Sequence, residues 1–191
     1  MTTINDPRFD ILVRDITDLV SLEQDEHKLT NLVANALRAA LADGITLPKP
    51  VTLPHTDNYV MYPLHIDPSG RFSIASAVWN TDQVTPVHSH ETWGVVGIYS
   101  GAEHERGYVR PQREERLVPK CEHMWTAGQV TVCCTTDDDV HQVSCGLADQ
   151  PCIGIHIYGA NIGTVLRYRF DAETGKATPF VSKWSYPAPT A

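Results

Sequence analysis

The sequence predicts a mainly β protein, organised as one antiparallel sandwich or barrel with a helical layer at its N-terminus. In the N-terminal part, apolar residues recur at every third or fourth position, as on one face of a helix. The rest consists of short β-branched and aromatic runs separated by Gly, Pro and Asp. At 191 residues the chain is long enough for one sizeable core and short for two, so we expect a single domain over residues 1–191.

The helical layer is expected over residues 1–45. Its periodic apolar positions are Ile11, Leu12, Ile16, Leu19, Val20, Leu29, Leu32, Val33, Ala36, Leu37, Ala40 and Leu41. Gly44 is suited to cap the end of this section, and the prolines between positions 47 and 54 terminate it.

The barrel is expected over residues 58–170. Strand-like runs fill it at 59–66, 72–79, 93–99, 102–110, 130–135, 141–144, 152–158 and 164–170. No helical pattern lies between these runs, which is typical of antiparallel β structure. Residues 171–191 are expected to form an irregular tail packed on the barrel, because turn-forming residues gather there: Gly175, Pro179, Pro187 and Pro189.

Composition excludes several classes of partner. The formal charge is −8, from 15 Lys and Arg against 23 Asp and Glu, which argues against nucleic acid or an anionic membrane. No apolar run reaches the roughly 18 residues of a membrane span, and the first residues lack the apolar segment of a signal peptide. The five cysteines are odd in number and lack the spacing of a disulfide scaffold. We therefore expect reduced thiols in a cytoplasmic protein.

The strongest chemical signal is the run PVHSHETWG, which contains His88 and His90. Histidines at i and i+2 on a strand project to the same face, so both imidazoles can meet one metal ion. About 50 residues later an acidic run, expected to be a solvated turn, leads into a strand at His141. A His-x-His strand beside a strand carrying a third His is the pattern of a cupin barrel. We therefore predict a metal site at His88, His90 and His141.

The expected ligand set is neutral. Many cupins place a carboxylate four residues after the second His, where this chain has Gly94, and Glu91 should point to the opposite strand face. Three neutral imidazoles leave about three coordination positions open and favour anionic ligands such as a thiolate. Imidazole suits Fe, Cu, Ni and Zn alike, so the spacing alone does not select the metal.

A second polar pattern lies in the run CIGIHIYG. Gly154, His156 and Tyr158 alternate with isoleucines, so they should share one strand face and present polar groups to a cavity. There the phenol could hydrogen-bond a bound reactant, with His156 orienting it. The alternative interpretation is a structural Tyr beside a satisfied core His. Trp93 is expected to line the pocket or to pack beneath it, and the alternating run AEHER is expected to be a solvated strand.

These residues together resemble the thiol dioxygenases, the family of cysteine dioxygenase and bacterial 3-mercaptopropionate dioxygenase. The resemblance runs from about residue 59 to 185, through PVHSHETWGVVGIYSGAE, DDDVHQV, IHIYGANIG and RYRFDAETG. It implies a single cupin barrel (a double-stranded β-helix, or jelly roll) and non-haem Fe(II) held by His88, His90 and His141. It also implies that a small thiol and O2 are converted to a sulfinate, and that His156 and Tyr158 match the last two members of a Ser-His-Tyr triad.

The chain departs from the family's pattern at three places. Gly154 stands at the triad's serine, so the relay to His156 is missing unless water or another side chain replaces it. Gly94 stands where the animal cysteine enzymes carry a cysteine crosslinked to tyrosine. Tyr62 falls where those enzymes carry the arginine that binds the substrate carboxylate.

The resemblance implies that Arg167 is the active-site arginine of the bacterial branch. It would hold a substrate carboxylate directly or through Tyr59 and Tyr62, and Arg169 shares its strand face, so their roles stay open. The thiol also stays open among 3-mercaptopropionate, cysteine, cysteamine and a bulkier thiol carboxylate, as does the oligomeric state. Two alternatives remain: another cupin metalloenzyme (a carbon–carbon-cleaving dioxygenase or a zinc or nickel isomerase), and a non-catalytic small-molecule-binding cupin.

Overall fold

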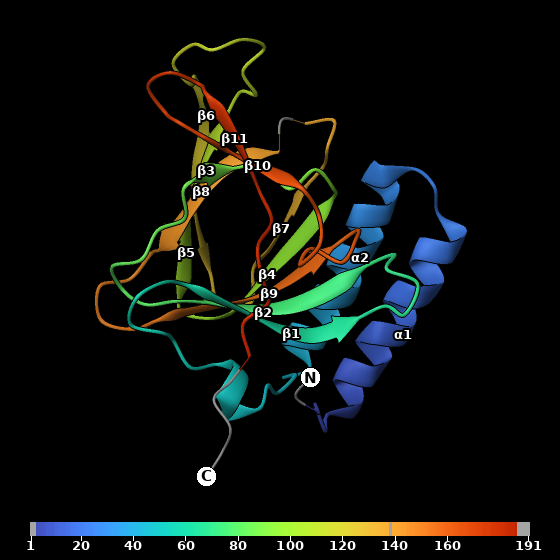
Figure 1. The fold of residues 1–191 in the computed structure, drawn as a ribbon. Helices are drawn as coiled ribbons and strands as arrows, with labels where there is room; N and C mark the ends of the chain where they lie inside the picture. Colours follow the sequence, from blue (N-terminus) through green and yellow to red (C-terminus); the bar gives the residue numbers. More distant parts are fainter. Residues whose placement is uncertain (1–2, 138, 187–191) are drawn as a thin grey trace.

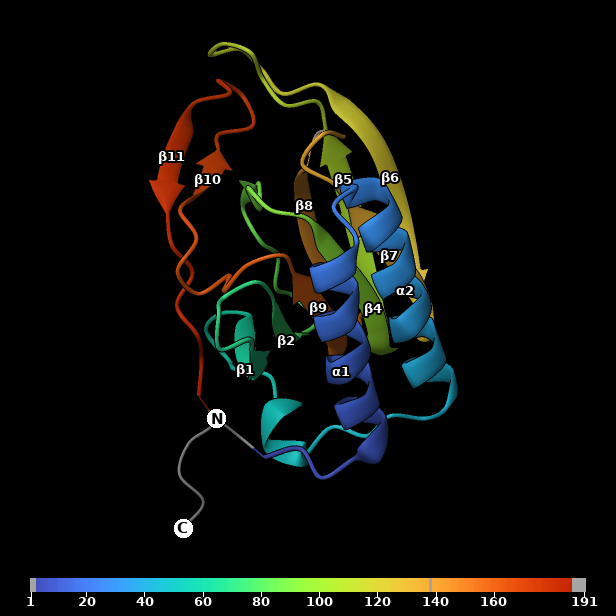
Figure 2. The ribbon, with the colours of Figure 1, turned by 90° about the vertical axis from the view of Figure 1, so that its right-hand side faces the viewer.

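Two helices lie against one side of a pair of β-sheets in the computed structural model, which describes residues 3–137 and 139–186 (Figures 1 and 2). Helix α1 (Pro7–Leu22) begins after Asp6, whose side chain accepts a hydrogen bond from Arg8 N at 2.9 Å. Helix α2 (Glu26–Ala42) is capped in the same way by Asp25. The predicted helical stretch is therefore confirmed as two helices, and a short 3-10 helix, η1 (Lys49–Val51), follows them. None of the described helices is both long and apolar enough to cross a membrane.

The strands form two sheets, and every pairing between described strands is antiparallel. The first has the order β1 (Val60–Ile66), β2 (Ser73–Trp79), β9 (Cys152–Tyr158), β4 (Gly94–Ser100) and β7 (Val130–Cys133). The second has the order β11 (Ala177–Phe180), β10 (Arg167–Phe170), β3 (Val87–His88), β8 (Val140–Cys145), β5 (Ala102–Tyr108) and β6 (Pro119–Thr126). Strands far apart in sequence alternate within each sheet, as in a double-stranded β-helix, and the predicted fold class is confirmed.

Two strands were not predicted from the sequence, and a third is shorter than expected. Strand β11 lies within the segment expected to be an irregular tail, and it pairs with β10. Strand β6 is exposed along nearly its whole length, so it lacks the apolar alternation that marks a half-buried strand. Strand β3, which was expected to carry both His88 and His90, is only two residues long and ends at His88. Of the predicted tail, Pro187 and Pro189 lie outside the described residues.

The main core lies between the helices and the first sheet. Ile16 of α1, Leu37 of α2 and Ile157 of β9 are all fully buried there. Helix α2 lies close to β4, because a side chain at Gly97 would come within 2.7 Å of Leu37. The sheet is thus covered on its outer face by helices, and its inner face, with β9 near the centre, turns toward the second sheet.

Candidate metal centre

The three predicted histidines come together between the two sheets. His88 at the end of β3 pairs directly with His141 on β8, and His90 follows β3 by two residues. Their ring centroids are 4.8–5.1 Å apart, and one ligand nitrogen from each ring lies within 4.8 Å of the other two. The clustering is confirmed, although His90 lies just beyond the strand. That the three residues hold a metal ion remains a prediction.

Two of the rings are oriented through their Nδ1 atoms. His88 Nδ1 lies 3.0 Å from the Pro86 carbonyl oxygen, and His141 Nδ1 lies 2.6 Å from Glu105 Oε1. A ring that donates its Nδ1 proton leaves Nε2 free as a ligand, and a carboxylate behind the ring increases its basicity. Burial alone would raise the pKa of Glu105, but its contacts with His141 lower the pKa to about 2. The carboxylate therefore stays ionised.

His90 is held through its backbone and its ring. Asp139 accepts hydrogen bonds from His90 N at 2.9 Å and Glu91 N at 3.0 Å, in a turn where Glu91 has a φ of 57°. His90 Nδ1 is 3.5 Å from Cys133 Sγ. The prediction of a wholly solvated acidic turn is therefore wrong for Asp139, which is buried and paired with Arg110; Asp138 lies outside the described residues.

Glu91 is confirmed as facing away from the imidazoles. Its carboxylate accepts hydrogen bonds from Ser89 Oγ at 2.6 Å and from Arg110. The ligand set is therefore three imidazoles, with no carboxylate among them in the described cluster. Burial, together with the neighbouring imidazoles, lowers the pKa of His88 and of His90 well below the usual value, so both rings are neutral near pH 7.

This donor set fits a divalent transition metal. His90 Nε2 and His141 Nε2 are 3.3 Å apart. Two nitrogens each about 2.1 Å from one metal, at roughly a right angle, would be about 3 Å apart. Neutral imidazoles with occupied Nδ1 atoms are the ligand form that Fe, Ni, Cu and Zn accept.

Strand β9 brings His156 and Tyr158 to the same cavity. His156 Nδ1 lies 3.0 Å from Tyr158 Oη, and the Tyr158 ring centroid lies 5.3 Å from that of His90. On its other side, His156 Nε2 lies 3.1 Å from Glu103 Oε1. Burial raises the pKa of Tyr158 well above its usual value, so the phenol keeps its proton.

The sequence interpretation of β5 was wrong in one respect. Its residues alternate between two faces as predicted, but the acidic face turns inward. Glu103 is 2% exposed and contacts His156, while Glu105 contacts His141. The outward residues His104 and Arg106 both reach Glu122 of β6. Only the period-two spacing of the two glutamates signalled a shared face.

A small cavity of about 20 Å³, the space of about one water molecule, adjoins the histidine cluster. It is lined by Tyr59, Met61, Ala77, Trp79, Thr85, His88, His90, His141, Val143, His156, Tyr158 and Arg167. Among these, Tyr59 alone is not buried, and its ring stacks on Trp79 at 5.6 Å. Trp79 was missed from the sequence because a tryptophan at a strand end resembles an ordinary core residue.

The structure separates the two candidate arginines. Arg167 is 2% exposed and lines the cavity, with its guanidinium over the Phe180 ring and bonded to Ser182 Oγ. Burial lowers the pKa of Arg167, but a guanidinium stays charged near pH 7. Arg169 lies over the same ring but is exposed and does not line the cavity.

Two of the residues predicted to contact substrate do not line the cavity. Tyr62 faces the helical layer, where it packs in the main core and donates a hydrogen bond from its hydroxyl to the Leu53 carbonyl at 2.9 Å. On β1 the neighbouring Met61 takes the cavity side, as strand alternation requires. Trp93 packs in the core of the helical side, the second of the two places expected for it, and its indole lies against Gly159.

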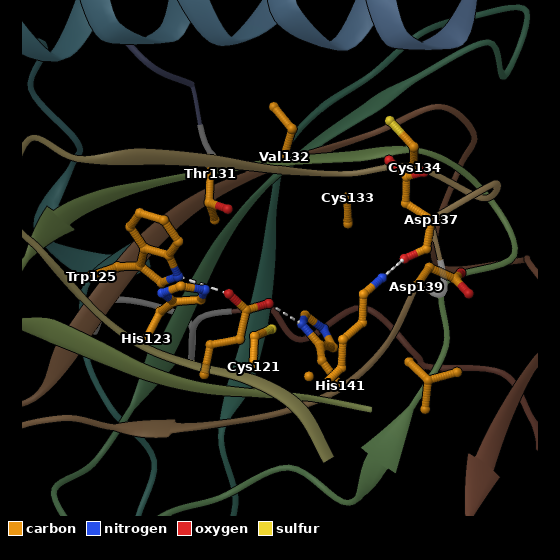
Figure 3. A pocket seen from close by; sticks show the side chains of 14 residues that line it. Cys121, His123, Trp125, Thr131, Val132, Cys133, Cys134, Asp137, Asp139 and His141 are labelled. Atoms are coloured by element: carbon orange, nitrogen blue, oxygen red, sulfur yellow. Dashed lines mark hydrogen bonds and ion pairs between the residues drawn. The ribbon is translucent and has the colours of Figure 1, made fainter. Parts of the chain in front are cut away.

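A second, more open pocket of about 330 Å³ reaches the cluster from the outside (Figure 3). Its lining includes the side chains of Trp125, Cys133 and His141, and Figure 3 shows His141 pointing toward a carboxylate that also receives the indole N–H of Trp125. That carboxylate belongs to Glu105. His141 lines both pockets, whereas Glu105, which contacts its Nδ1, lines only the open one.

Several solved structures are similar to this chain in fold. No protein-family model matches the chain. A protein from Thermus thermophilus is 15% identical with a TM-score of 0.48, covering 61% of this chain and 96% of that one. A double-stranded β-helix protein from Klebsiella pneumoniae is 10% identical with a TM-score of 0.46, covering 73% and 98%.

A Cupin 2 conserved barrel domain protein from Salinispora arenicola is 13% identical with a TM-score of 0.43, covering 61% of this chain and 88% of that one. These similarities concern the fold and not the activity. The fold rests on the chain's own strand order, which is that of a cupin-type double-stranded β-helix with three histidines gathered between its sheets.

Proposed function

We propose that this protein is a non-haem Fe(II) thiol dioxygenase that converts a small thiol carboxylate, of the size of 3-mercaptopropionate, and O2 to the sulfinate. One observation carries the proposal beyond the fold. Among the described residues, two buried side-chain N–H groups lack a hydrogen-bond partner, Trp79 Nε1 and Arg167 Nε. Both residues line the same cavity as the three imidazoles.

An unpaired buried N–H group costs about 1–3 kcal/mol, so two of them at one cavity favour an occupant that accepts hydrogen bonds. A carboxylate offers two acceptor oxygens and neutralises the buried charge of Arg167. The thiol at the other end of the same small molecule would then face the histidine cluster. An amine or a thiol without a carboxylate would not pair with the two N–H groups, so the cavity favours a thiol carboxylate.

His88, His90 and His141 would hold the iron. Fe(II) bound there would supply the redox chemistry that joins a thiolate and O2 into the sulfinate (RS⁻ + O2 → RSO2⁻). Arg167 orients the carboxylate, a charge-assisted contact worth about 1.5–3 kcal/mol. Tyr158 directs its hydroxyl group to the reacting end, and buried side chains around the cavity keep bulk water away.

The cavity must widen to admit such a substrate. Its volume of about 20 Å³ holds about one water molecule, whereas the substrate has several non-hydrogen atoms. Tyr59 is the one lining side chain with appreciable exposure, so its displacement from Trp79 is the simplest opening. The tight fit favours short, unbranched thiols over bulky ones.

The first experiment measures O2 consumption by anaerobically iron-loaded protein with 3-mercaptopropionate, cysteine, cysteamine and mercaptosuccinate. We expect one O2 per sulfinate with a thiol carboxylate and loss of uptake in His88→Ala. Cysteamine, which lacks a carboxylate, should react poorly. No uptake with any thiol by fully iron-loaded protein would refute the reaction and favour a carbon–carbon-cleaving enzyme; failure to bind iron would favour an isomerase or a binding protein.

A matched pair of arginine variants then tests the carboxylate contact. Arg167→Met should raise KM for the thiol carboxylate by roughly tenfold to a hundredfold, the equivalent of the lost contact. Arg169→Met changes the exposed neighbour on the same strand face and should leave KM unchanged. Equal effects in the two variants would exclude Arg167 as the specific contact.

We also propose the cytoplasm as the site of this reaction. The five cysteines are all free, including the exposed Cys121, which suits a reducing compartment. Expression of a tagged protein followed by cell fractionation would test this placement.

A further inference from the structure

A buried carboxylate of β5 completes a chain of polar groups that ends at the cavity. Glu103 is 2% exposed, and its Oε1 lies 3.1 Å from His156 Nε2. His156 Nδ1 in turn lies 3.0 Å from Tyr158 Oη. Glu103 and Glu105 share the inward face of β5. This one strand therefore supplies both carboxylates, Glu103 to His156 and Glu105 to the predicted metal ligand His141.

Gly154 makes room for this contact. A Cβ atom at Gly154 would lie 2.6 Å from His156 Nε2 and 3.5 Å from Glu103 Oε1. The first distance is well inside van der Waals contact, and β9 places the two residues on the same face. A side chain at position 154 would therefore push the imidazole away from the carboxylate.

We propose that Glu103 is a positioning residue that holds the ring proton of His156 on Nε2 and thereby sets the direction of the Tyr158 hydroxyl group. An ionised carboxylate only accepts hydrogen bonds, so His156 Nε2 must carry a proton to face it. When this is the ring's single proton, Nδ1 carries a lone pair and accepts the hydroxyl proton of Tyr158, whose oxygen then faces the cavity with its lone pairs.

Without the carboxylate the ring proton could move to Nδ1. A ring protonated there would donate to Tyr158 Oη, and the phenol proton would be left for an acceptor in the cavity. Glu103 thus decides whether Tyr158 is a donor or an acceptor toward a reactant. The kinetic part of this inference rests on the proposed function, whereas the protonation of His156 does not.

The test combines a spectrum with kinetics in Glu103→Gln. Nitrogen-15 NMR of histidine-labelled, metal-free protein reports which ring nitrogens carry protons, and His156→Asn assigns the signals. We expect the ring proton of His156 on Nε2 in the native protein and a shift of that proton toward Nδ1 in Glu103→Gln. With a thiol substrate, kcat should fall by about 10- to 100-fold while KM changes little.

Two further variants make the result specific. Gly154→Ala keeps Glu103 but displaces His156, so it should reproduce the spectral change. Glu122→Gln breaks an equivalent Glu–His contact on the outer face, 2.6 Å from His104 Nε2, and should alter neither the His156 signals nor kcat. Melting curves identify any variant that fails to fold.

A native His156 without a proton on Nε2, or a spectrum and kcat unchanged in Glu103→Gln, would overturn the inference. If no thiol reacts with the native enzyme, the proposed function fails on its own. The NMR comparison would still decide whether Glu103 controls the protonation of His156.

Discussion

At the scale of single residues, the candidate centre depends on groups placed behind the predicted ligands. Each imidazole has a different partner at Nδ1: a backbone carbonyl for His88, a thiol for His90 and a carboxylate for His141. Such partners fix the ring orientation and the tautomer before a metal arrives. The strongest acceptor among these partners is the ionised Glu105, so its removal should weaken metal binding most.

We predict that Glu105→Gln weakens metal binding by about 10- to 100-fold, because an amide supports the ring of His141 less well than a carboxylate. Competition with a chelator of known affinity measures the effect on Fe(II) or Zn²⁺ binding. Glu115→Gln, an exposed change away from the cluster, serves as the control. An unchanged affinity in Glu105→Gln would show that this contact does not tune the site.

The indole N–H of Trp79 provides a second test at this scale. Trp79→Phe keeps an aromatic ring against Tyr59 and removes only the unpaired donor and part of the ring. If the donor binds a substrate carboxylate, KM should rise by about threefold to tenfold, in line with the loss of one hydrogen bond of roughly 1 kcal/mol. The same variant should leave turnover of cysteamine unaffected, and a rise with both thiols would indicate a general packing effect.

At the scale of elements, the strands carry residues of the candidate site on one face and residues of the hydrophobic core on the other. In β9 the inward residues contact Glu103 and the cavity, while Ile155 and Ile157 pack beneath the helices. In β4 the outward Gly97 lets α2 lie directly on the sheet. The helical layer thus packs against the outer face of the strands whose inner face lines the candidate site.

We predict that Gly97→Val destabilises the fold by about 1–3 kcal/mol, because the new side chain would overlap Leu37 and Leu41 of α2. Urea unfolding followed by circular dichroism measures the loss. Val132→Leu, on the adjacent strand β7 but 39% exposed, should change stability by less than about 0.5 kcal/mol. A Gly97→Val protein as stable as the native one would mean that α2 can move away at little cost.

At the scale of the whole molecule, a buried carboxylate and its arginine partner connect helix α1 to the barrel. Asp67, in the turn between β1 and β2, accepts two side-chain hydrogen bonds from Arg71, which also donates to Ser21 of α1. The Arg71 guanidinium lowers the pKa of Asp67 to about 2. A group with a depressed pKa stabilises the fold above its unfolded-state pKa, near 4, and loses that contribution as the pH falls toward 2.

We therefore predict that Asp67→Asn lowers the melting temperature at pH 7 and that this difference shrinks between about pH 4 and pH 2. Melting curves across that range provide the measurement. Asp57→Asn, a change at an exposed loop carboxylate, should show no such trend. A constant difference down to pH 2 would mean that the ion pair with Arg71 does not contribute to acid sensitivity.

Much of this architecture follows from local patterns in the chain. The three-to-four spacing from Ile11 to Leu41 and the short alternating runs predict two layers, and His88 with His90 predicts a shared face. These signals are reliable because the periods of helices and strands are set by backbone geometry. Strand β6 escaped prediction because an exposed edge strand carries no burial pattern.

The sequence by itself determined the fold class and the histidines that gather, because both depend on spacing within a few residues. Only the tertiary structure decided that Glu103 and Glu105 turn inward, that Arg167 rather than Arg169 meets the cavity, and that Tyr62 does not. Alternation assigns residues to two faces without saying which face is buried. Which face is buried depends on contacts between strands that are distant in sequence, such as the contact between Glu103 and His156.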